Sequence, residues 1–491
     1  MSKFNLSTEN KNKTTNISGV TAYKMSDKDK LISQVLTSFF NEKKFYGDNS
    51  AEIVTLVQRV LDTDPKFIAN LALYARSEMH MRTISHVLIA ELARHEQGKP
   101  YAKRTIYKGV ERVDDMTEIL SYYIAQYGKP IPNSMKKGLV DKFATFNEYS
   151  LAKYNRKKEV RLKDILCLTH PIPKDDEQAD LWKRVLEDRL ETPVTWETEL
   201  SAKGNKKEVW EKLILEDRLG YMALMRNLRN IFLADVSDYC KRKVYEVIAN
   251  EERVLKNKQL PFRYHSAYKS LKNADLPWDS KILNALEDAI EISTQNLNVL
   301  EGKTLIAADV SASMSGRISD KSEVQCSEIA TLLMSIANSL CEEAITTTFD
   351  TSLKLLNLPK RNGIISNMNS IPINGGGTDI TLPIKYLLER KIFVDRIIIL
   401  SDNEINSGWE TGGWWGRSSV PCQKLVEDYK REINPNVWVH AIDLQGYGTQ
   451  QFNGQNVNLI AGWNENILDF MALAEKGEGN LRQKIEGYYF K

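Results

Sequence analysis

Cysteine is scarce in this sequence. The 491 residues include five cysteines, at positions 167, 240, 326, 341 and 422. No two of them form a CxxC pattern, and the number is odd. This excludes a disulfide framework and a CxxC redox or zinc motif, and it favours a reducing, cytoplasmic location.

Long apolar runs are also missing. A membrane-spanning helix needs about 18 consecutive apolar residues, and no such run is present, so we expect no membrane partner. The first 18 residues, MSKFNLSTENKNKTTNIS, are polar and lack the apolar segment of a signal peptide. They predict a disordered tail over residues 1–18.

The chain has no strong excess of one charge, because 67 Lys and Arg residues face 65 Asp and Glu residues. The charge is nevertheless unevenly distributed. Residues 301–491 hold 18 basic and 23 acidic residues, whereas residues 1–300 hold 49 basic and 42 acidic residues. A basic N-terminal part favours a polyanionic partner.

Apolar residues recur at helical spacing from about residue 27 to about residue 295. Asp64-Pro65, for example, is typical of an N-cap followed by proline in the first turn. Short helices joined by short turns predict stacked antiparallel pairs, an α-solenoid-like array. No strict sequence period is present, so an irregular helical domain is the alternative.

The pattern changes near residue 300, where strands begin to alternate with helices. The predicted strands are 304–310, 344–350, 396–402 and 436–444, and the predicted helices are 322–341, 382–390, 422–433 and 465–476. This alternation predicts a doubly wound α/β domain with a parallel sheet over residues 300–491.

Oxygen-rich side chains follow these strands. DVSAS follows the first strand, GGGTD precedes a helix, and SDNE follows RIIIL. Ligands of open α/β sheets bind at the carboxyl ends of the strands. Two carboxylates and three hydroxyls suit Mg²⁺, with Mn²⁺ as the alternative. The predicted ligands are Asp309, Ser311, Ser313, Thr378 and Asp402. Alternatively, the Ser and Thr residues cap the next helix.

Motifs of common enzymes are absent. Gly302-Lys303-Thr304 looks like the end of a P-loop, but Leu297 stands where the first glycine is needed. No GxSxG elbow is present, and His440 lies in a strand pattern that predicts packing. We therefore predict no catalytic residue.

The most basic stretch is KYNRKKEVRLK, residues 153–163, which holds six cations and one acid. Tyr154 lies within it, and His170 follows just before two prolines. Such a cluster can bind phosphates and stack on exposed bases. The alternative is a solvated charged face, as most charge runs are.

Several segments resemble the TROVE module of the Ro 60 kDa family, as in a bacterial or phage-type Ro orthologue. They are LYARSEMHMRTISHVLIAELA (73–93), LAKYNRKKEVRLKDILCLTHPIP (151–173), MALMRNLRN (222–230) and LPFRY (260–264). DVSASMSG, GGGTD and LSD resemble the metal-ion-dependent adhesion site of a von Willebrand factor A domain, which follows the TROVE module in that family. The resemblance implies a TROVE domain over 19–299, whose HEAT-like repeats close into a monomeric ring, and a von Willebrand A domain over 300–491.

The resemblance also implies a function. Family members bind small structured Y-class RNAs on a basic outer surface, and they bind single-stranded 3′ ends of misfolded RNA in the central hole. Such a ribonucleoprotein is non-catalytic and tethers a nuclease for RNA quality control, with a 3′-to-5′ exoribonuclease as a candidate partner. The RNA-binding residues of the family match Lys153, the Arg156/Lys157 pair and His170. An ungapped match falls on Lys157, which lacks the bidentate fork of Arg. His170 could instead simply end a helix.

Two other hypotheses compete with an RNA-binding scaffold. One is a protein-interaction module whose metal binds a partner's Asp or Glu. The other is a metal-dependent nuclease, which the small number of carboxylates disfavours. The loop 406–421 carries Trp409, Trp414 and Trp415 beside the predicted metal site. It is either a partner-binding or base-stacking surface, or a loop that packs its own tryptophans.

Overall fold

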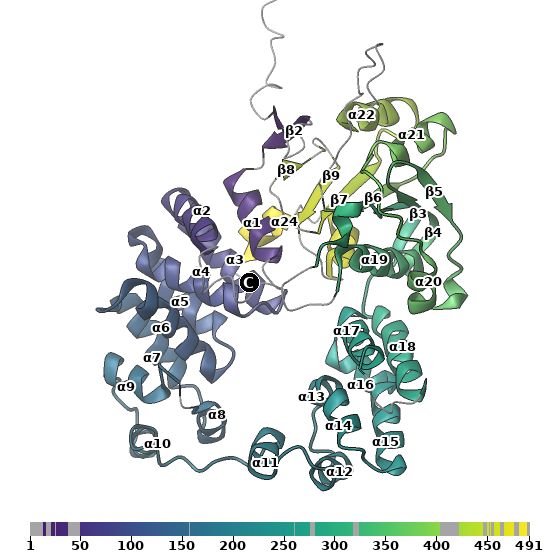
Figure 1. Ribbon diagram of the computed structural model, residues 1–491. Coiled ribbons are helices and arrows are strands. Elements are labelled where there is room, and N and C mark those ends of the chain that lie inside the picture. The colour runs from purple at the N-terminus through teal and green to yellow at the C-terminus, as the bar shows by residue number, and fades with distance from the viewer. Residues whose placement is uncertain are drawn as a thin grey trace, which may run out of the picture. The chain divides into compact units, whose positions relative to one another are not determined.

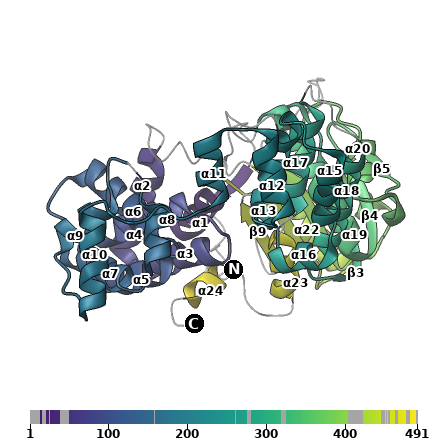
Figure 2. The ribbon, with the colours of Figure 1, turned by 90° about the horizontal axis from the view of Figure 1, so that it is seen from below.

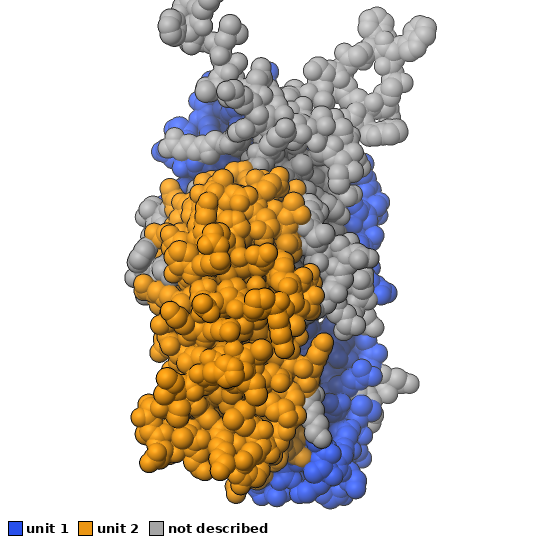
Figure 3. Space-filling model, turned by 90° about the vertical axis from the view of Figure 1, so that its left-hand side faces the viewer, with its two compact units in different colours: residues 1–25, 199–478 blue, residues 26–198, 479–491 orange. Residues whose placement is uncertain are grey.

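The computed structural model describes residues 13–15, 21–24, 26–37, 50–156, 158–259, 261–274, 280–317, 324–402, 422–444, 449–450, 452, 456–461, 466–475 and 481–488. The chain divides into two compact units, coloured separately in Figure 3. Unit 1 comprises residues 1–25 and 199–478, and unit 2 comprises residues 26–198 and 479–491. The polypeptide therefore leaves unit 2 after residue 198 and returns to it at residue 479.

Unit 2 is helical (Figure 1). Its first helices begin as the sequence predicts. The Asp64 carboxylate accepts a hydrogen bond of 3.0 Å from the backbone N–H of Phe67, and Pro65 occupies the first turn. Its helices are α1 (Asp27–Thr37), α2 (Ser50–Thr63), α3 (Pro65–Ser77), α4 (Thr83–Arg94), α5 (Lys99–Gly109), α6 (Val113–Tyr127), α7 (Asn133–Phe143), α8 (Glu148–Tyr154), α9 (Leu162–Thr169), α10 (Asp176–Leu186) and α24 (Leu481–Glu486), with a short 3-10 turn η5 (Glu96–Gly98).

The C-terminal helix α24 packs on α3 within unit 2 (Figure 2). Lys28 Nζ donates to Glu486 Oε1 at 2.9 Å, and the Asn70 side-chain amide donates to the backbone oxygen of Glu486 at 2.7 Å. The rings of Tyr74 and Tyr488 meet edge to face at 5.5 Å. Residues from both ends of the chain thus complete one packed unit.

One group of helices in unit 1 precedes the sheet domain in the sequence. They are α12 (Lys207–Leu215), α13 (Tyr221–Arg226), α14 (Leu228–Leu233), α15 (Asp238–Ile248), α16 (Glu251–Asn257), α17 (Pro261–Lys272) and α18 (Ser280–Thr294). Helix α11 (Trp196–Lys203) contains the division between the two units. Helix α18, the last of this group, ends at Thr294, and the first strand of the sheet domain begins at Leu300, near the predicted domain boundary. The division between the two compact units lies about a hundred residues earlier.

A six-stranded sheet has the strand order β5-β4-β3-β6-β7-β9, and its pairs are parallel except for β4 with β5. The strands are β3 (Leu300–Asp309), β4 (Cys341–Phe349), β5 (Leu353–Leu356), β6 (Arg396–Ser401), β7 (Trp438–Asp443) and β9 (Val457–Ala461). The accompanying helices are α19 (Cys326–Leu340), α20 (Ile364–Ser370), α21 (Leu382–Glu389), α22 (Cys422–Glu432) and α23 (Asn466–Glu475), with 3-10 turns η6 (Ala312–Ser315) and η7 (Lys360–Asn362).

Helices cover both faces of this sheet (Figure 1). Leu305 and Ile397 belong to the core that contains Ile384 of α21 and Val426 of α22, while α19 packs on β3, β4 and β6. Because side chains alternate along a strand, the continuous apolar runs of β3 and β6 supply both faces. The doubly wound α/β prediction and the preceding helical array are confirmed. Closure of that array into a ring stays a prediction.

A second, small sheet joins β1 (Lys13–Thr15), β2 (Thr21–Lys24) and β8 (Thr449–Gln450) in antiparallel pairs. Lys13–Thr15 is therefore strand within the range predicted as a disordered tail. His440 is buried as predicted, with Nε2 2.9 Å from Glu475 Oε1. Among the helices in the described parts of the chain, none has the length and apolarity that crossing a membrane requires.

Candidate nucleic-acid surface and metal site

The basic stretch predicted to bind RNA lies in unit 2, at the end of α8 and the beginning of α9. Three of its cations have acidic partners. Lys158 pairs with Glu118, and Asp188 binds both Arg161 at 2.5 Å and Lys163 at 3.1 Å. The hydrogen bond from Lys163, aided by the charge of Arg161, lowers the pKa of Asp188. These three cations thus share two carboxylates, so their charge is partly neutralised by the protein itself.

The remaining cations are the ones matched to RNA binding. Lys153 is half-buried and Arg156 is exposed, and neither forms an ion pair with any residue the structure describes. Lys157 lies outside the described residues. Of the predicted set, Lys153, Arg156 and His170 can thus be placed. Lys153 lies beside the Tyr154 ring at the end of α8, whereas His170 lies at the other end of α9 from the basic stretch. We refer to Lys153, Arg156, His170 and Tyr154 as the α8–α9 surface.

The ring of Tyr154 forms cation–π contacts with two side chains. The Arg112 guanidinium carbon lies 4.7 Å from the ring centroid, and Lys153 Nζ lies 5.8 Å from it. Arg112 is itself held by two hydrogen bonds of 3.1 Å to the Asp114 carboxylate. Arg112 precedes α6 and is absent from the predicted set, because only the fold brings it to Tyr154.

His170 ends α9 in the left-handed conformation, with φ 47° and ψ 58°. Its backbone N–H donates to the Leu166 carbonyl oxygen at 2.9 Å, so the backbone closes the helix. The imidazole takes no part in this closure, and the residue is exposed. Both expectations for His170, ending a helix and offering a ring to a ligand, are therefore compatible with its geometry. Ile172, two residues on, is 90 % exposed.

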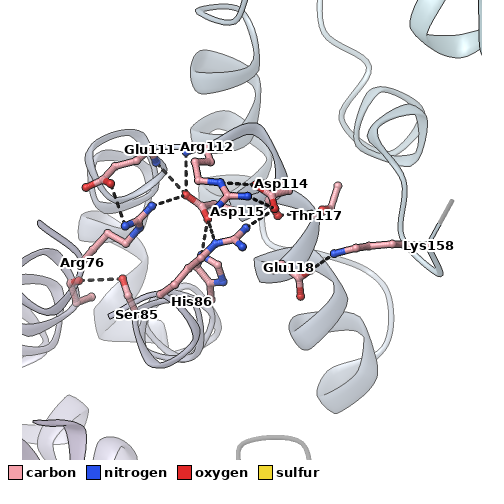
Figure 4. Close-up of polar contacts among 12 residues, drawn as sticks. Arg76, Ser85, His86, Glu111, Arg112, Asp114, Asp115, Thr117, Glu118 and Lys158 are labelled. Atoms are coloured by element: carbon pink, nitrogen blue, oxygen red, sulfur yellow. Dashed lines mark hydrogen bonds and ion pairs between the residues drawn. The ribbon is translucent and has the colours of Figure 1, made fainter. Parts of the chain in front are cut away.

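A buried polar cluster lies behind Arg112 (Figure 4). The Asp115 carboxylate is fully buried and bonds Arg76 Nη2 at 3.1 Å and His86 Nε2 at 3.1 Å, and it also accepts from Arg82. It accepts the backbone N–H groups of Glu111 at 3.1 Å and Arg112 at 2.9 Å as well. Asp115 therefore fixes the turn from which Arg112 reaches Tyr154.

Charge keeps Asp115 ionised. Burial alone would raise the pKa of Asp115, but the His86 hydrogen bond and the charges of Arg82 and Arg76 outweigh burial and lower the pKa well below its usual range. Burial also lowers the pKa of His86, so its ring is neutral at pH 7. The arginines thus carry the compensating charge. Sequence reasoning missed this cluster, because acids in a first helical turn usually face solvent.

The predicted metal ligands lie in unit 1, at the carboxyl edge of the six-stranded sheet. Strand β3 ends at Asp309, and β6 ends at Ser401, immediately before Asp402. The two strands are neighbours, with Ala308 opposite Leu400. Asp309 Oδ1 accepts the backbone N–H of Ser311 at 2.9 Å, and Oδ2 accepts the Ser401 hydroxyl at 2.7 Å. Parallel register thus brings both carboxylates to one edge.

Two backbone hydrogen bonds hold the loop that contains the three consecutive glycines, residues 375–377, at this edge. Gly375 N–H donates to the Val310 oxygen at 3.0 Å, and Ala312 N–H donates to the Gly376 oxygen at 2.9 Å. Gly375 has φ +78°, and a Cβ on Gly376 would lie 3.2 Å from Asp350 Oδ2, so glycine suits both positions. Thr378, two residues further along this loop, is buried.

The donor chemistry of this edge fits a hard divalent cation. The hydroxyl oxygens of Ser311 and Ser313 lie 3.1 Å apart, and Asp309 and Asp402 are fully buried. Burial, together with the charge of Asp402, raises the pKa of Asp309 to about 7. Two buried carboxylates that disfavour each other's ionisation are stabilised by a cation between them. In the described residues, no group of three or more His, Cys, Asp or Glu side chains is arranged to hold a metal, so a cation at this edge would need hydroxyl oxygens in addition to the acids.

Two further acids lie at the same edge and were not predicted. Asp350 follows β4, and Oδ1 accepts from Ser352 N–H at 2.8 Å, while its backbone oxygen accepts Asp379 N–H at 2.9 Å. Asp443 ends β7 opposite Ser401. The signal was present in the sequence, since both acids directly follow apolar strand residues. Trp409, Trp414 and Trp415 of the predicted tryptophan-rich loop lie outside the described residues.

Comparison with known families matches the sequence model of the TROVE domain to residues 10–188 and 183–357. The model of the Ro60 von Willebrand A domain matches residues 303–412. The TROVE match extends past residue 300, so it follows neither the predicted domain boundary nor the division into units.

Several curated proteins are similar in sequence, and three of them are described here. Telomerase protein component 1 of Rattus norvegicus is 24% identical over 335 residues, and that of Mus musculus is 23% identical over 338 residues. Each alignment covers 51% of this chain and 13% of the relative. RNA-binding protein RO60 of Deinococcus radiodurans is 27% identical over 130 residues, which is 26% of this chain and 24% of that protein. The chain thus matches only a small part of each relative.

A solved structure has the same fold. The crystal structure of the Deinococcus radiodurans RO (RSR) protein matches with a TM-score of 0.68, covering 92% of this chain and all of that one, at 16% sequence identity. At this identity the likeness concerns the fold alone.

Proposed function

Since the chain belongs to the TROVE family and carries a Ro60 von Willebrand A domain, we propose that it is an RNA-binding protein that holds RNA on the α8–α9 surface. One relative is named an RNA-binding protein, and this property is proposed here for the present chain. The basic balance of residues 1–300 supports a polyanionic ligand.

The observation that carries the proposal is the pairing pattern within the basic stretch. Lys158, Arg161 and Lys163 have acidic partners, whereas Lys153 and Arg156 have none among the residues described. Exposed lysines that are unpaired in the described structure also occur on α7 and α10, but Lys153 lies 5.8 Å from the centroid of the Tyr154 ring, which puts an unpaired cation beside an aromatic ring. Phosphates would replace the missing acids, and the rings of Tyr154 and His170 offer contacts to an unstacked base.

The more specific part of the proposal is based on the resemblance to the Ro family. We propose that the ligand of the α8–α9 surface is a small structured, Y-like RNA, and that the chain also takes up single-stranded 3′ ends of misfolded RNA. In this proposal the protein is a non-catalytic scaffold, and its RNA tethers a 3′-to-5′ exoribonuclease for RNA quality control. A cytoplasmic location and a monomeric ring stay predictions.

We further propose that the carboxyl edge of the sheet binds Mg²⁺, with Mn²⁺ as the alternative, through Asp309, Ser311, Ser313, Thr378 and Asp402. The metal would offset the repulsion between two buried acids and would present an open coordination position. This supports a second candidate function, in which a partner's carboxylate completes the coordination. Asp350 and Asp443 lie at the same edge, but in the described residues no three acid, histidine or cysteine side chains are grouped to hold a metal, so the paired metals of a nuclease lack support and we propose no hydrolytic role.

The test of RNA binding uses a folded RNA hairpin with an internal loop and fluorescence anisotropy. In the variant Lys153→Ala/Arg156→Ala/His170→Ala we expect about 10- to 100-fold weaker binding and a shallower dependence on salt, because phosphate contacts release counterions. Lys137→Ala/Lys183→Ala is the control, since both lysines are exposed, neither forms an ion pair in the described structure, and they lie on α7 and α10. Unchanged affinity in the triple variant would refute the surface. An equal loss in the control would indicate unspecific attraction to the whole unit.

A further inference from the structure

A pocket of about 470 Å³ lies at the amino edge of the six-stranded sheet in unit 1. Strands β3, β6 and β7 begin at this edge, whereas the predicted metal ligands lie at the opposite, carboxyl edge. The lining includes three acids, one arginine and two aromatic side chains, namely Glu301, Asp395, Glu475, Arg396, Phe393 and Trp438. Neither the α8–α9 surface nor the metal site contains any of these residues.

The guanidinium of Arg396 is fully engaged within the protein. Arg396 is buried, its Nε donates to Glu475 Oε1 at 2.7 Å, and its Nη2 also donates to the Glu475 carboxylate. Its Nη1 donates to the backbone oxygen of Glu301 at 2.7 Å and to the Thr304 hydroxyl at 2.9 Å. Arg396 and Glu475 therefore form a bidentate pair whose charges offset each other.

The other two acids of the pocket have no such partner. Neither Glu301 nor Asp395 forms an ion pair with any residue the structure describes. The charge of Asp395 raises the pKa of Arg396, but Arg396 binds Glu475 instead, and the nearby Lys303 ammonium pairs with Glu343. Three acids against one arginine leave the lining with a net charge of −2 at pH 7. The pocket therefore attracts cations and repels phosphates.

The backbone holds Asp395 in place. Its N–H donates to the Lys303 oxygen at 2.8 Å, its backbone oxygen accepts the Trp438 N–H at 3.0 Å, and its Oδ2 accepts the Lys303 N–H at 2.7 Å. Gly302 has φ +78°, and a Cβ at this position would collide with the Asp395 carboxylate, so the close approach requires glycine. A carboxylate fixed in this way costs little entropy to order when a ligand binds.

The rim of the pocket is apolar and partly open to solvent. Val299 is 61% exposed and Phe393 is 51% exposed. The half-buried Trp438 ring stacks on the buried His440 ring, with 5.8 Å between the centroids and 7° between the planes. Aromatic faces and aliphatic surface beside unpaired carboxylates fit a cation that has an apolar stem. An inorganic cation would use the acids and leave this rim without a contact.

We propose that this pocket binds an organic ammonium ion, with its charge at Glu301 and Asp395 and its aliphatic stem against Trp438 and Phe393. Two sources share this chemistry, a free polyamine and a lysine side chain of another protein. The volume lies within the range of about 300–1,000 Å³ that is common for small-molecule sites. The inference goes beyond the proposed RNA binding and does not rest on it, since the charge of the pocket is opposite to that of the α8–α9 surface.

The test titrates the full chain, freed of nucleic acid, with spermidine and with the terminally blocked peptide GKGKGKG, which also carries three ammonium groups. Isothermal titration calorimetry measures both affinities. In Glu301→Gln/Asp395→Asn we expect the affinity for the tighter probe to fall by about 10-fold or more, because two charge-assisted hydrogen bonds are lost. Tighter binding of spermidine supports a free polyamine as the ligand, and tighter binding of the peptide supports a lysine side chain of a protein.

Two further variants address the rim. Val299→Lys keeps both acids but places an ammonium group of the protein at the mouth of the pocket, and we expect it to cause the same loss of affinity. Trp438→Leu should weaken binding by about 2- to 5-fold, the value of an exposed cation–π contact. Glu208→Gln/Glu251→Gln is the charge-matched control. Both acids are exposed in unit 1, have no ion pair in its described part and do not line the pocket, so affinity should stay within about twofold of wild type.

Several outcomes would overturn the proposal. They are retained affinity in Glu301→Gln/Asp395→Asn or in Val299→Lys, and a loss in the control equal to that in the pocket variants. Displacement of both probes by equimolar Mg²⁺ would overturn it in favour of an inorganic cation. A wild-type chain that binds neither probe up to about 1 mM would also overturn it, whatever its affinity for RNA. Circular dichroism checks that each variant is folded.

Discussion

Arg112 lies over the ring of Tyr154, with 4.7 Å between the guanidinium carbon and the ring centroid. The contact joins the start of α6 to the end of α8, and it is supported from behind by Asp114 and Asp115. Arg112 therefore connects the buried charge cluster around Asp115 to the exposed basic surface. The cluster can be tested through stability and the surface through RNA affinity.

Tyr154→Leu should weaken binding of the folded hairpin by about 2- to 5-fold. The ring interacts with two cations, and an exposed cation–π contact contributes about 0.5–1 kcal/mol to holding them. Anisotropy titrations measure the change, and Tyr149→Leu on the same helix is the control, since Tyr149 is 54% exposed. Equal effects of the two substitutions would show that Tyr154 has no special role.

Asp115→Asn should destabilise unit 2 by about 3–5 kcal/mol. The substitution keeps the shape of the side chain but removes the fully buried carboxylate that pairs with both Arg76 and Arg82. Glu111 still pairs with Arg76 and Asp114 with Arg82, but the cluster is left with uncompensated buried positive charge, which is destabilising. Urea unfolding followed by circular dichroism measures the loss. Asp141→Asn is the control, because its ion pair with Lys103 at 2.7 Å is exposed and should contribute only about 0–1 kcal/mol. A loss no larger than that of the control would contradict the prediction.

Acidification should destabilise unit 1 through His265. The imidazole is buried, and burial lowers its pKa to about 4. The nearby charge of Glu328 raises this pKa and that of Lys269 lowers it, but burial has the larger effect. The unfolded chain binds this proton near pH 6.5, so the stabilisation is fully present above pH 6.5 and is lost as the pH falls towards 4. The loss should reach about 3 kcal/mol. Calorimetry between pH 7.5 and 4 measures it, and in His265→Gln this part of the pH dependence should disappear.

Mg²⁺ should raise the melting temperature of the wild-type chain, and EDTA should reverse the rise, because binding to the folded state alone stabilises it. Ser313→Ala should abolish most of this shift, since it removes a predicted donor. Ser315→Ala, in the same turn, should leave the shift unchanged, because its hydroxyl donates to the Ala312 oxygen at 2.7 Å. Equal shifts in all three proteins would place any bound metal elsewhere.

Asp309→Asn should make the metal-free protein as stable as the wild type or more stable. Neutralising Asp309 removes the cost of burying its charge and its repulsion with Asp402, which are the two causes that raise the pKa of Asp309. In saturating Mg²⁺ the order should reverse, because only the wild type binds the ion. Differential scanning fluorimetry with and without Mg²⁺ measures both orders. A variant less stable than metal-free wild type would contradict the expectation.

Local patterns in the sequence are sufficient to predict the strands of the sheet domain. The run RIIIL predicts a strand buried on both faces, and β6 is Arg396–Ser401. Strand ends then fixed the positions of Asp309 and Asp402, since parallel register alone brings them to one edge. Asp350 and Asp443 could have been found by the same reasoning.

Long-range pairing could not be predicted in this way. Asp115 resembles an ordinary acid in a helical first turn, but its partners Arg76 and His86 come from α3 and α4. In the basic stretch, the sequence alone does not show which cations have acidic partners and which do not. Only the fold separates Arg161 and Lys163, which share Asp188, from Lys153 and Arg156. Partners that lie about 25 or more residues away leave no local signal.

The position of α24 has a consequence for how the protein is made. Lys28 and Asn70 are among the first residues of unit 2 to leave the ribosome, yet Glu486, to which both are hydrogen-bonded, is synthesised more than four hundred residues later. Until then, the Tyr74 ring lacks Tyr488, and the side of α3 that receives α24 stays uncovered. The nascent chain must therefore grow by more than four hundred residues beyond α3 before unit 2 can finish folding, and the uncovered side of α3 is accessible to a chaperone throughout that interval.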